Sequence, residues 1–225
     1  MLKLDGLSVG YDGRVLLKEV SQIVGDGELI LLAGSNGAGK STLLKTLAGL
    51  LKPLEGTFES DRDCILVPTN IPKVKGFTVA DFIRTSFCSV SGWTGRLDSG
   101  MRESAERSMS LLGVLHLKGR DVSSLSDGEF QKVCIAAAIA RADGVILLDE
   151  PTAFLDVDSR ADLLSMLRSL CHEHGLTVLF SSHDVLSSIP YADRVFSILA
   201  DGTLSASDGS EESKMRTVSA AFRSL

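Results

Sequence analysis

Short runs of apolar residues, punctuated by glycine, proline and aspartate, occur at both ends of the chain. Such runs indicate β-strands, because four to eight consecutive apolar residues suit a strand that is buried on both faces. We predict strands over residues 4–9, 15–24, 29–33, 64–67, 145–148, 177–180 and 195–199. The last of these pairs with the chain that returns after the turn Asp201-Gly202.

Helical spacing appears between these strands. The two clearest helices carry apolar residues at Leu43, Leu44, Leu47, Leu50 and Leu51, and at Leu163, Leu167 and Leu170. Because strands alternate with helices, the pattern predicts an α/β protein with a mainly parallel sheet and helices on both of its faces. Beyond Ser210 the chain is polar at first, and only Val218 and Phe222 offer apolar surface to bury.

The middle of the chain differs in character from its two ends. Residues 73–141 carry helical patterns and a loop rich in serine and glycine at 89–100. We interpret this stretch as a helical lobe inserted into a single domain, whose α/β core is formed by residues 1–72 and 142–225.

Composition narrows the possible partners. The net charge of −6 argues against a nucleic acid, because neutralising its phosphates requires a basic face. No apolar run approaches the roughly 18 residues of a membrane span, and the first residues lack the apolar core of a secretory signal. The four cysteines lie far apart, three of them within apolar runs. We therefore expect reduced, buried thiols and a cytosolic setting.

A glycine-rich motif lies between the strand at 29–33 and the helix that follows it. Its residues are Gly34, Ser35, Asn36, Gly37, Ala38, Gly39, Lys40, Ser41 and Thr42. Strand, glycine-rich turn, Lys-Ser and helix together form the context of a P-loop, which binds nucleotide phosphates through backbone N–H groups. Lys40 can reach the β- and γ-phosphates, and the Ser41 hydroxyl can bind Mg²⁺. The motif predicts that the chain binds ATP or GTP.

Two carboxylates follow the predicted strand at 145–148. The end of this buried strand delivers Asp149 and Glu150 to the phosphate site. Asp149 is placed to hold Mg²⁺ through water, and Glu150, which points the other way, can polarise the attacking water. These residues predict hydrolysis of the nucleotide.

The order of the remaining motifs resembles the ATP-binding-cassette (ABC) ATPases. Leu125-Ser126-Asp127-Gly128-Glu129 is similar to the family's signature sequence, and a helix that carries Gln131, Ile135 and Ile139 follows it. Ser126 and the Gly128 backbone would lie at the helix N-terminus, which favours an anion. In the family this site closes over the γ-phosphate held by a second subunit. The resemblance therefore implies an ABC ATPase fold with an N-terminal antiparallel β region, and an ATP-dependent head-to-tail homodimer.

Three further residues correspond to family positions. Pro151-Thr152-Ala153-Phe154-Leu155-Asp156 looks like the stretch that leads into the D-loop, with Asp156 as its aspartate. His183, just past the strand at 177–180, matches the switch histidine that contacts the γ-phosphate and keeps Glu150 and water aligned. Tyr11 corresponds to the aromatic residue that stacks on adenine, and this favours ATP as the nucleotide.

The sequence departs from the family pattern at two places. Thr69 occupies the position of a glutamine that touches Mg²⁺ and water, with Asn70 beside it as a substitute. The signature carries Asp127 and Glu129 where the commonest version has glycine and glutamine. Glutamate at the last place is frequent in importers of iron chelates, haem and cobalamin.

The resemblance spans residues 11–202 and implies an ATPase subunit that drives a membrane transporter. Because the chain has no membrane segment, separate permease subunits would form the pathway and dock on the helical lobe beside Thr69. The chain would then lie peripherally on the cytoplasmic face of the inner or plasma membrane, with a substrate-binding protein as an indirect partner. Phe77-Thr78-Val79-Ala80-Asp81, Gly92-Trp93-Thr94-Gly95-Arg96-Leu97 and the signature look most like the import group for iron siderophores, haem and cobalamin.

Two other functions remain open at this stage. One is a soluble, non-transport ABC ATPase, such as one that assembles iron–sulfur clusters, since it too is a single acidic cassette. The other is a nucleotide-binding module that has lost catalysis, suggested by the missing glutamine. The presence of both Glu150 and His183 argues against the second.

Overall fold

The computed structural model describes residues 1–87, 98–141 and 144–222. These residues form two compact units. The first contains Met1–Thr69, Gly144–Ala153 and Leu167–Leu225, and the second contains Asn70–Asp143 and Phe154–Met166. The division differs from the sequence-based one mainly at residues 154–166, which group with the helical unit. Within the described ranges, no helix has both the length and the apolar character needed to span a membrane.

A three-stranded antiparallel sheet begins the first unit. It has the order β2-β1-β4, with β1 at Leu2–Tyr11, β2 at Arg14–Val24 and β4 at Glu55–Ser60. The first two strands confirm the prediction of an N-terminal antiparallel β region. The sequence analysis missed β4, because its residues Glu-Gly-Thr-Phe-Glu-Ser are mostly polar and exposed and it is held by backbone pairing with β1.

The second sheet has six strands in the order β5-β6-β7-β3-β8-β9. Their bounds are Cys64–Val67, Val145–Leu148, Thr177–Ser181, Leu29–Ala33, Arg194–Ile198 and Leu204–Ala206. All neighbours are parallel except β8 and β9, which form the predicted antiparallel pair. Every residue of β3, β6 and β7 is buried, as expected for central strands covered on both faces.

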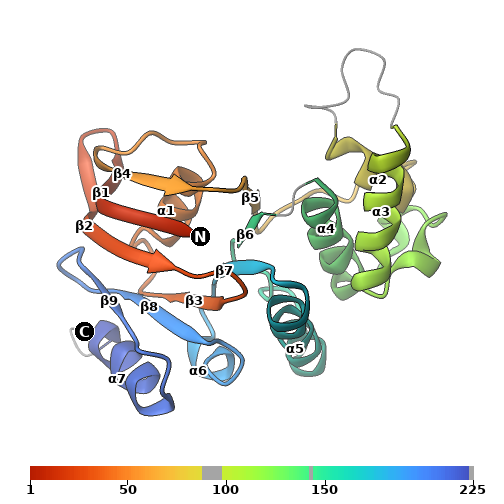
Figure 1. The fold of residues 1–225 in the computed structure, drawn as a ribbon. Coiled ribbons are helices and arrows are strands. Elements are labelled where there is room, and N and C mark those ends of the chain that lie inside the picture. The colour runs from red at the N-terminus through yellow and green to blue at the C-terminus, as the bar shows by residue number, and fades with distance from the viewer. Residues whose placement is uncertain (88–97, 142–143, 223–225) are drawn as a thin grey trace. The chain divides into compact units, whose positions relative to one another are not determined.

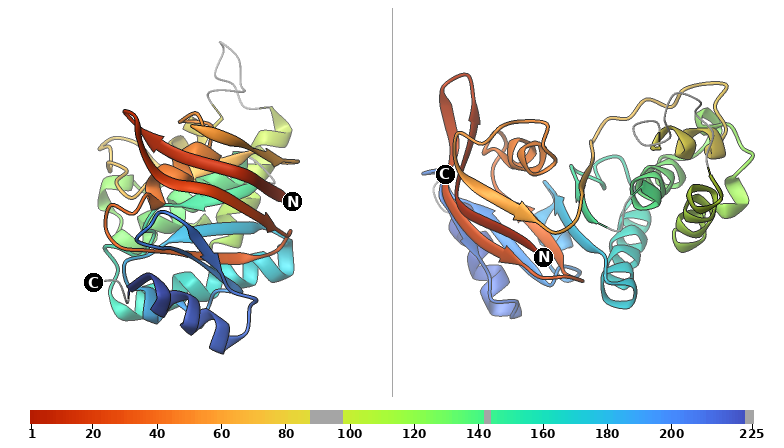
Figure 2. Two further views of the ribbon diagram at one scale, coloured as in Figure 1. Left: turned by 90° about the vertical axis from the view of Figure 1, so that its left-hand side faces the viewer. Right: turned by 45° about the horizontal axis from the view of Figure 1, so that its top comes forward.

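Helices cover both faces of this sheet in the first unit. Figure 1 shows α1 (Lys40–Leu47) on the side of the small sheet, and α6 (Val185–Ser188) and α7 (Glu211–Phe222) on the other side. The main core lies between the small sheet, α1 and the facing side of the large sheet, and Leu7, Leu32 and Leu44 are fully buried there. Figure 2 shows the same layering, with β1, β2 and β4 in red and orange and α7 in dark blue.

One predicted helix and the predicted burial in the C-terminal region need correction. Helix α1 ends at Leu47, because Gly49 has a positive φ of 72° and turns the chain away. Leu50 therefore lies outside the helix and is 65% exposed. In the C-terminal region α7 buries Val218 as expected, but Phe222 is 38% exposed, and Lys214, Thr217 and Ala221 are buried residues that the sequence did not indicate.

The second unit is helical. It contains α2 (Val79–Thr85), α3 (Ser99–Leu111), α4 (Asp127–Arg141) and the start of α5 (Val157–His174), with two short 3₁₀ turns at Leu115–Leu117 and Val122–Ser124. Helix α4 packs against both α2 and α3, and Phe82 of α2 meets Phe130 of α4 edge to face at 5.4 Å between ring centroids. Trp93 and the sequence around it lie outside the described residues.

The cysteines that the structure describes are free thiols: Cys64, Cys134 and Cys171. Burial raises the pKa of Cys134 and of Cys171 to about 12. At neutral pH these two thiols stay protonated and behave as small apolar side chains.

Candidate functional site

The glycine-rich motif connects strand β3 to helix α1. Gly37 and Gly39 have φ values of 78° and 106°, which L-residues with side chains rarely adopt. A Cβ at Gly39 would lie 2.5 Å from Leu17 Cδ1 and 3.0 Å from Leu16 Cβ, so this glycine is required by close packing. A Cβ at Gly37 would meet nothing within 4 Å. The loop therefore rests tightly on β2 at one end and presents open backbone at the other, as a phosphate cradle requires.

Lys40 is buried at the start of α1. Its ammonium donates to the carbonyl oxygens of Gly34 at 2.8 Å and Ser35 at 3.1 Å, so the side chain folds back over the loop. Burial lowers the pKa of Lys40, while the nearby charges of Glu150 and Asp149 oppose that shift. The loop carbonyls thus hold the Lys40 ammonium at the place where the loop would bind nucleotide phosphates.

Ser41 and Asp149 come together from distant parts of the chain. The Ser41 hydroxyl donates to Asp149 Oδ1 at 3.0 Å. Among the described residues, no cluster of three or more His, Cys, Asp and Glu side chains could hold a metal ion alone. One hydroxyl and one carboxylate are hard oxygen ligands, and Mg²⁺ is commonly bound by one or two such groups together with substrate phosphates and water. The residues present therefore fit Mg²⁺ bound together with a nucleotide.

Glu150 and His183 meet beside this pair. His183 Nδ1 is in hydrogen-bond contact with Glu150 Oε2. Glu150 has a positive φ of 53° and sits in the turn after β6, and its backbone N–H donates to Ser181 Oγ at 2.9 Å. The histidine follows buried Ser182, whose hydroxyl accepts from the N–H of Asp184 at 3.1 Å. The predicted base and the predicted switch residue are thus direct neighbours.

Thr69 follows β5, which is paired with β6, the strand that ends at Leu148 just before Asp149. The Asp149 N–H donates to the carbonyl of Val67 at 3.0 Å, so the two strand ends stay paired up to that point. Thr69 is half-buried, and Asn70 is exposed. Metal binding by Thr69 stays a prediction.

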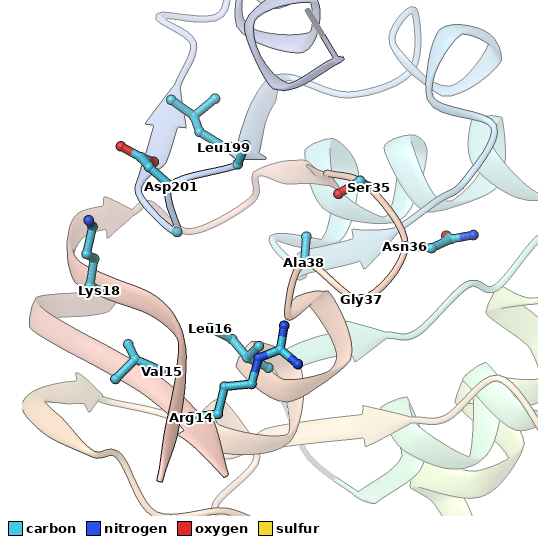
Figure 3. Close-up of a pocket in the computed structure, with 12 residues that line it drawn as sticks. Arg14, Val15, Leu16, Lys18, Ser35, Asn36, Gly37, Ala38, Leu199 and Asp201 are labelled. Atoms are coloured by element: carbon cyan, nitrogen blue, oxygen red, sulfur yellow. The ribbon is translucent and has the colours of Figure 1, made fainter. Parts of the chain in front are cut away.

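A hollow of about 400 Å³ adjoins the P-loop (Figure 3). It is bounded by the loop at residues 35–38, by β2 residues including Arg14 and Leu16, and by the turn at 199–202. Tyr11 is half exposed at the end of β1, opposite Arg14, and does not line this hollow. Adenine stacking by Tyr11 stays a prediction, and Arg14 and Leu16 are neighbours of the phosphate loop that sequence reasoning missed.

The signature sequence forms a capped helix start in the second unit. The Ser126 N–H donates to Glu129 Oε2 at 2.8 Å, and the Glu129 N–H donates to Ser126 Oγ at 3.2 Å. This reciprocal pair is a capping box at the N-terminus of α4. The bond from the Ser126 N–H is the main cause of the lowered pKa of Glu129. Gly128 lies in the same first turn and is half-buried.

Both acidic residues of the signature are paired with cations that sequence reasoning missed. Lys73 Nζ lies 2.7 Å from Asp127 Oδ1, donates to the carbonyl of Leu125 at 2.8 Å and stacks over the Phe130 ring. Arg120 contacts Glu129 Oε1 at 3.4 Å and donates to the carbonyl of Ser124 at 3.0 Å. The negative charges that this signature adds beside its helix N-terminus are therefore each matched by a positive charge.

Asp156 caps helix α5. Its carboxylate accepts from the Ser159 N–H at 2.9 Å and from the Ser159 hydroxyl at 2.8 Å, and these bonds lower the pKa of Asp156. Phe154 and Val157 on either side are 64% and 77% exposed. The structure gives Asp156 this capping role, and its predicted D-loop role is not tested by it.

Comparison with known proteins gives a consistent result. Residues 17–153 match the family model described as ABC transporter. The chain is 35% identical over 225 residues to a hemin import ATP-binding protein, HmuV, of Gloeobacter violaceus, covering 91% of this chain and 80% of that protein. It is also 35% identical over 198 residues to a zinc import ATP-binding protein, ZnuC, of Paramagnetospirillum magneticum, covering 87% and 72%.

A solved structure agrees with these sequence matches. CbiO1 from Clostridium perfringens, part of the ABC transporter complex CbiONQ, superposes with a TM-score of 0.79 at 25% identity, over 99% of this chain and 96% of that one. The predicted fold class is confirmed by this likeness.

Proposed function

Because this chain belongs to the ABC transporter family, as an ATP-hydrolysing subunit, we propose that it powers an importer of an iron chelate, haem or cobalamin. The observation that carries the catalytic part of the proposal is a pair of side-chain contacts in the first unit, Ser41 with Asp149 and Glu150 with His183. Lys40 and Ser41 begin the helix after the P-loop, Asp149 and Glu150 follow β6, and His183 follows β7, which lies between β6 and the P-loop strand β3.

Each of these residues has a proposed chemical role. Backbone N–H groups of residues 34–42 and the Lys40 ammonium bind the phosphates, and Ser41 and Asp149 hold Mg²⁺. Bound Mg²⁺ would neutralise phosphate charge. Glu150 takes the proton of the attacking water, and His183 holds the Glu150 carboxylate in place through their hydrogen bond.

The signature is proposed to bind the γ-phosphate held by a second copy. The Ser126 hydroxyl caps the N-terminus of α4 and Gly128 lies in its first turn, where partial positive charge favours an anion. Exposed Phe154 and Val157 flank Asp156 and offer apolar surface to the same second copy. ATP would then join two chains head to tail.

The ion pairs of the signature lead to a testable prediction about this dimer. Lys73→Met leaves the Asp127 charge uncompensated beside the anion site, and we expect ATP-driven dimerisation to weaken roughly threefold to fivefold, the scale of an exposed ion pair. Asp127→Gly, which removes the charge, should restore dimerisation in the Lys73→Met variant. The measurement is size-exclusion chromatography with ATP across a concentration series, in a background that carries Glu150→Gln to slow hydrolysis.

Lys118→Met provides a matched control, because Lys118 forms an exposed ion pair in the same unit whose partner, Glu106 at 2.5 Å, lies on α3 and not in the signature. This variant should dimerise as the parent does. Weakening by Lys73→Met that Asp127→Gly leaves unchanged would show that Lys73 does not act by compensating Asp127.

The proposed transport role requires a surface that binds membrane subunits, and we place this surface on the second unit. We propose that residues 73–141 form the lobe on which separate permease subunits dock, at the cytoplasmic face of the membrane, with a substrate-binding protein acting indirectly. Val74, Phe77 and Leu115 of this unit are large apolar side chains that are 45%, 40% and 42% exposed. The choice of iron chelate, haem or cobalamin is supported by the resemblances of the signature and of residues 77–81. The zinc import relative, which is equally identical, is the competing cargo class.

Affinity purification of the tagged chain from detergent-solubilised membranes tests this role. We expect to recover a membrane protein with several membrane spans in an amount nearly equal to that of the tagged chain. Identifying the cargo that the associated substrate-binding protein binds would then decide between the iron-chelate, haem or cobalamin class and the zinc class. Phe77→Ser should reduce this recovery, while the control Leu186→Ser, at a side chain 65% exposed in the first unit, should not. Recovery of soluble partners alone would instead support a non-transport ATPase, such as one for iron–sulfur assembly.

A further inference from the structure

Ser181 connects the two carboxylate residues of the proposed active site. It is the last residue of β7 and is completely buried. Its hydroxyl donates to Asp149 Oδ1 at 2.8 Å and accepts the backbone N–H of Glu150 at 2.9 Å. One buried hydroxyl thus contacts both the proposed metal ligand and the backbone of the proposed base.

The sheet explains why the serine lies there. Strands β6 and β7 are parallel neighbours, with Leu148 opposite Phe180 at their carboxyl ends. The next residues along the two strands are Asp149 and Ser181, which therefore lie side by side. A hydroxyl at this position can serve as donor and acceptor at once, whereas an apolar residue would leave the Glu150 N–H without this partner.

The backbone of Glu150 depends on such a partner. A glutamate with φ of 53° is strained, and residues of this kind persist where surrounding bonds fix them. The same arrangement is found at a second glutamate among the described residues of the first unit, Glu19, which has φ of 52° and whose N–H donates to Ser8 Oγ at 3.1 Å. Glu19 is exposed on β2. The hydrogen bond described for the Ser8 hydroxyl is the one from Glu19, whereas the Ser181 hydroxyl also bonds a carboxylate, that of Asp149. The Ser8–Glu19 pair lies outside the residues proposed for catalysis, so this backbone conformation can rest on a serine oxygen for structural reasons alone.

We propose that Ser181 is a positioning residue for ATP hydrolysis: it fixes Asp149 Oδ1 and the left-handed turn at Glu150 in one arrangement. Through Asp149, which also accepts the Ser41 hydroxyl at 3.0 Å, it orients the ligands of Mg²⁺. Through the Glu150 backbone it aims the carboxylate that contacts His183. This inference rests on the proposed catalytic roles of Asp149 and Glu150.

The first test is Ser181→Ala, measured by steady-state ATP hydrolysis and by calorimetric titration with ATP in the presence and absence of Mg²⁺. We expect kcat to fall roughly 10- to 100-fold, the scale of a small misplacement of a catalytic group. ATP affinity without Mg²⁺ should be unchanged, and the Mg²⁺-dependent gain in affinity should shrink. A purely structural serine would lower the melting temperature and leave this Mg²⁺-dependent gain intact.

A pair of isosteric variants separates the hydroxyl from the space it fills. Ser181→Thr and Ser181→Val have side chains of the same shape, and both suit a strand, but only threonine keeps the hydroxyl. Threonine should retain most of kcat, and valine should lose it. Combined with Glu150→Gln, the valine change should cause little further loss of kcat, because both act on the same step.

Ser8→Ala serves as the matched control. It removes a serine beneath a glutamate with positive φ, at a buried site of the same unit, and should change stability without changing kcat or the response to Mg²⁺. Equal kcat in Ser181→Thr and Ser181→Val would overturn the role of Ser181. The proposed function would still stand after that outcome, provided that the wild type hydrolyses ATP and Glu150→Gln does not. Absence of Mg²⁺-dependent hydrolysis in the wild type, reconstituted with its membrane partners, would instead refute the proposed function itself.

Discussion

Glu150→Gln is expected to lower the kcat for ATP hydrolysis by roughly 10²-fold or more while ATP binding is retained, since the change removes a general base. Glutamine has nearly the same size as glutamate and can still accept a hydrogen bond from His183. What it loses is the ability to take a proton from water. Rapid-quench measurement of a single turnover, with membrane partners present, reports the chemical step directly, and calorimetry reports binding.

Glu19→Gln is the control for this prediction. It makes the same chemical change at another glutamate with positive φ, whose exposed side chain lies on β2 and does not line the hollow beside the P-loop, and it should leave hydrolysis unchanged. The Glu150→Gln variant should also accumulate as an ATP-bound dimer, because bound ATP is no longer consumed. Equal rates of hydrolysis in wild type and Glu150→Gln would mean that another group accepts the proton.

The strands whose bounds could be predicted most closely are short apolar runs that lie between turn residues. Residues 29–33, 64–67 and 145–148 form strands with the predicted bounds, because continuous apolar runs between turn residues suit strands of a parallel sheet. The strands at 29–33 and 145–148 are fully buried, and the strand at 64–67 is half-buried at the edge of the sheet. Strand β4 at Glu55–Ser60 could not be found in this way. Its polar residues carry no period, and only pairing with β1 makes it a strand.

Helix ends and the C-terminal region depend on tertiary packing in a similar way. The apolar positions Leu50 and Leu51 fit the period of α1, yet the backbone turns at Gly49. Helix α7 is stabilised by contacts that a polar sequence does not show, such as the buried Lys214 ammonium that donates to the Ala192 carbonyl at 2.9 Å. Such a bond joins two segments whose proximity no local pattern predicts.

In the candidate site too, residues that belong to a local motif could be predicted, and residues placed by distant partners could not. The P-loop is a local motif whose context of strand and helix can be recognised in nine consecutive residues, and Asp149 and Glu150 follow an apolar run. Ser181 and Lys73 carry no such signal, because serine and lysine are common and their partners are 32 and 54 residues away. Knowing that β6 and β7 are parallel neighbours would have placed Ser181 beside Asp149, so strand order is the missing information.

Lys40→Met is expected to weaken ATP binding roughly 30- to 150-fold, which corresponds to about 2–3 kcal/mol for a lost charge-assisted hydrogen bond. In the structure the ammonium is buried and held by the Gly34 and Ser35 carbonyls. Because burial removes part of the hydration of this positive charge, the pKa of Lys40 is lowered. Phosphate oxygens would supply the missing compensation. Methionine is an unbranched side chain one atom shorter than lysine and provides none of this charge. Hydrolysis should fall further than binding, because the γ-phosphate is no longer stabilised.

Lys45→Met isolates this effect. Lys45 lies in the last turn of the same helix and is exposed, so its replacement changes net charge equally without touching the P-loop. Calorimetric titration with ATP and with AMP should show a large loss for Lys40→Met with ATP, a small one with AMP and none for Lys45→Met, because AMP lacks the β- and γ-phosphates. Equal losses with both nucleotides would place the Lys40 contact at the α-phosphate or in the fold of the loop. Unchanged ATP affinity in Lys40→Met would mean that the nucleotide phosphates bind elsewhere than at this ammonium.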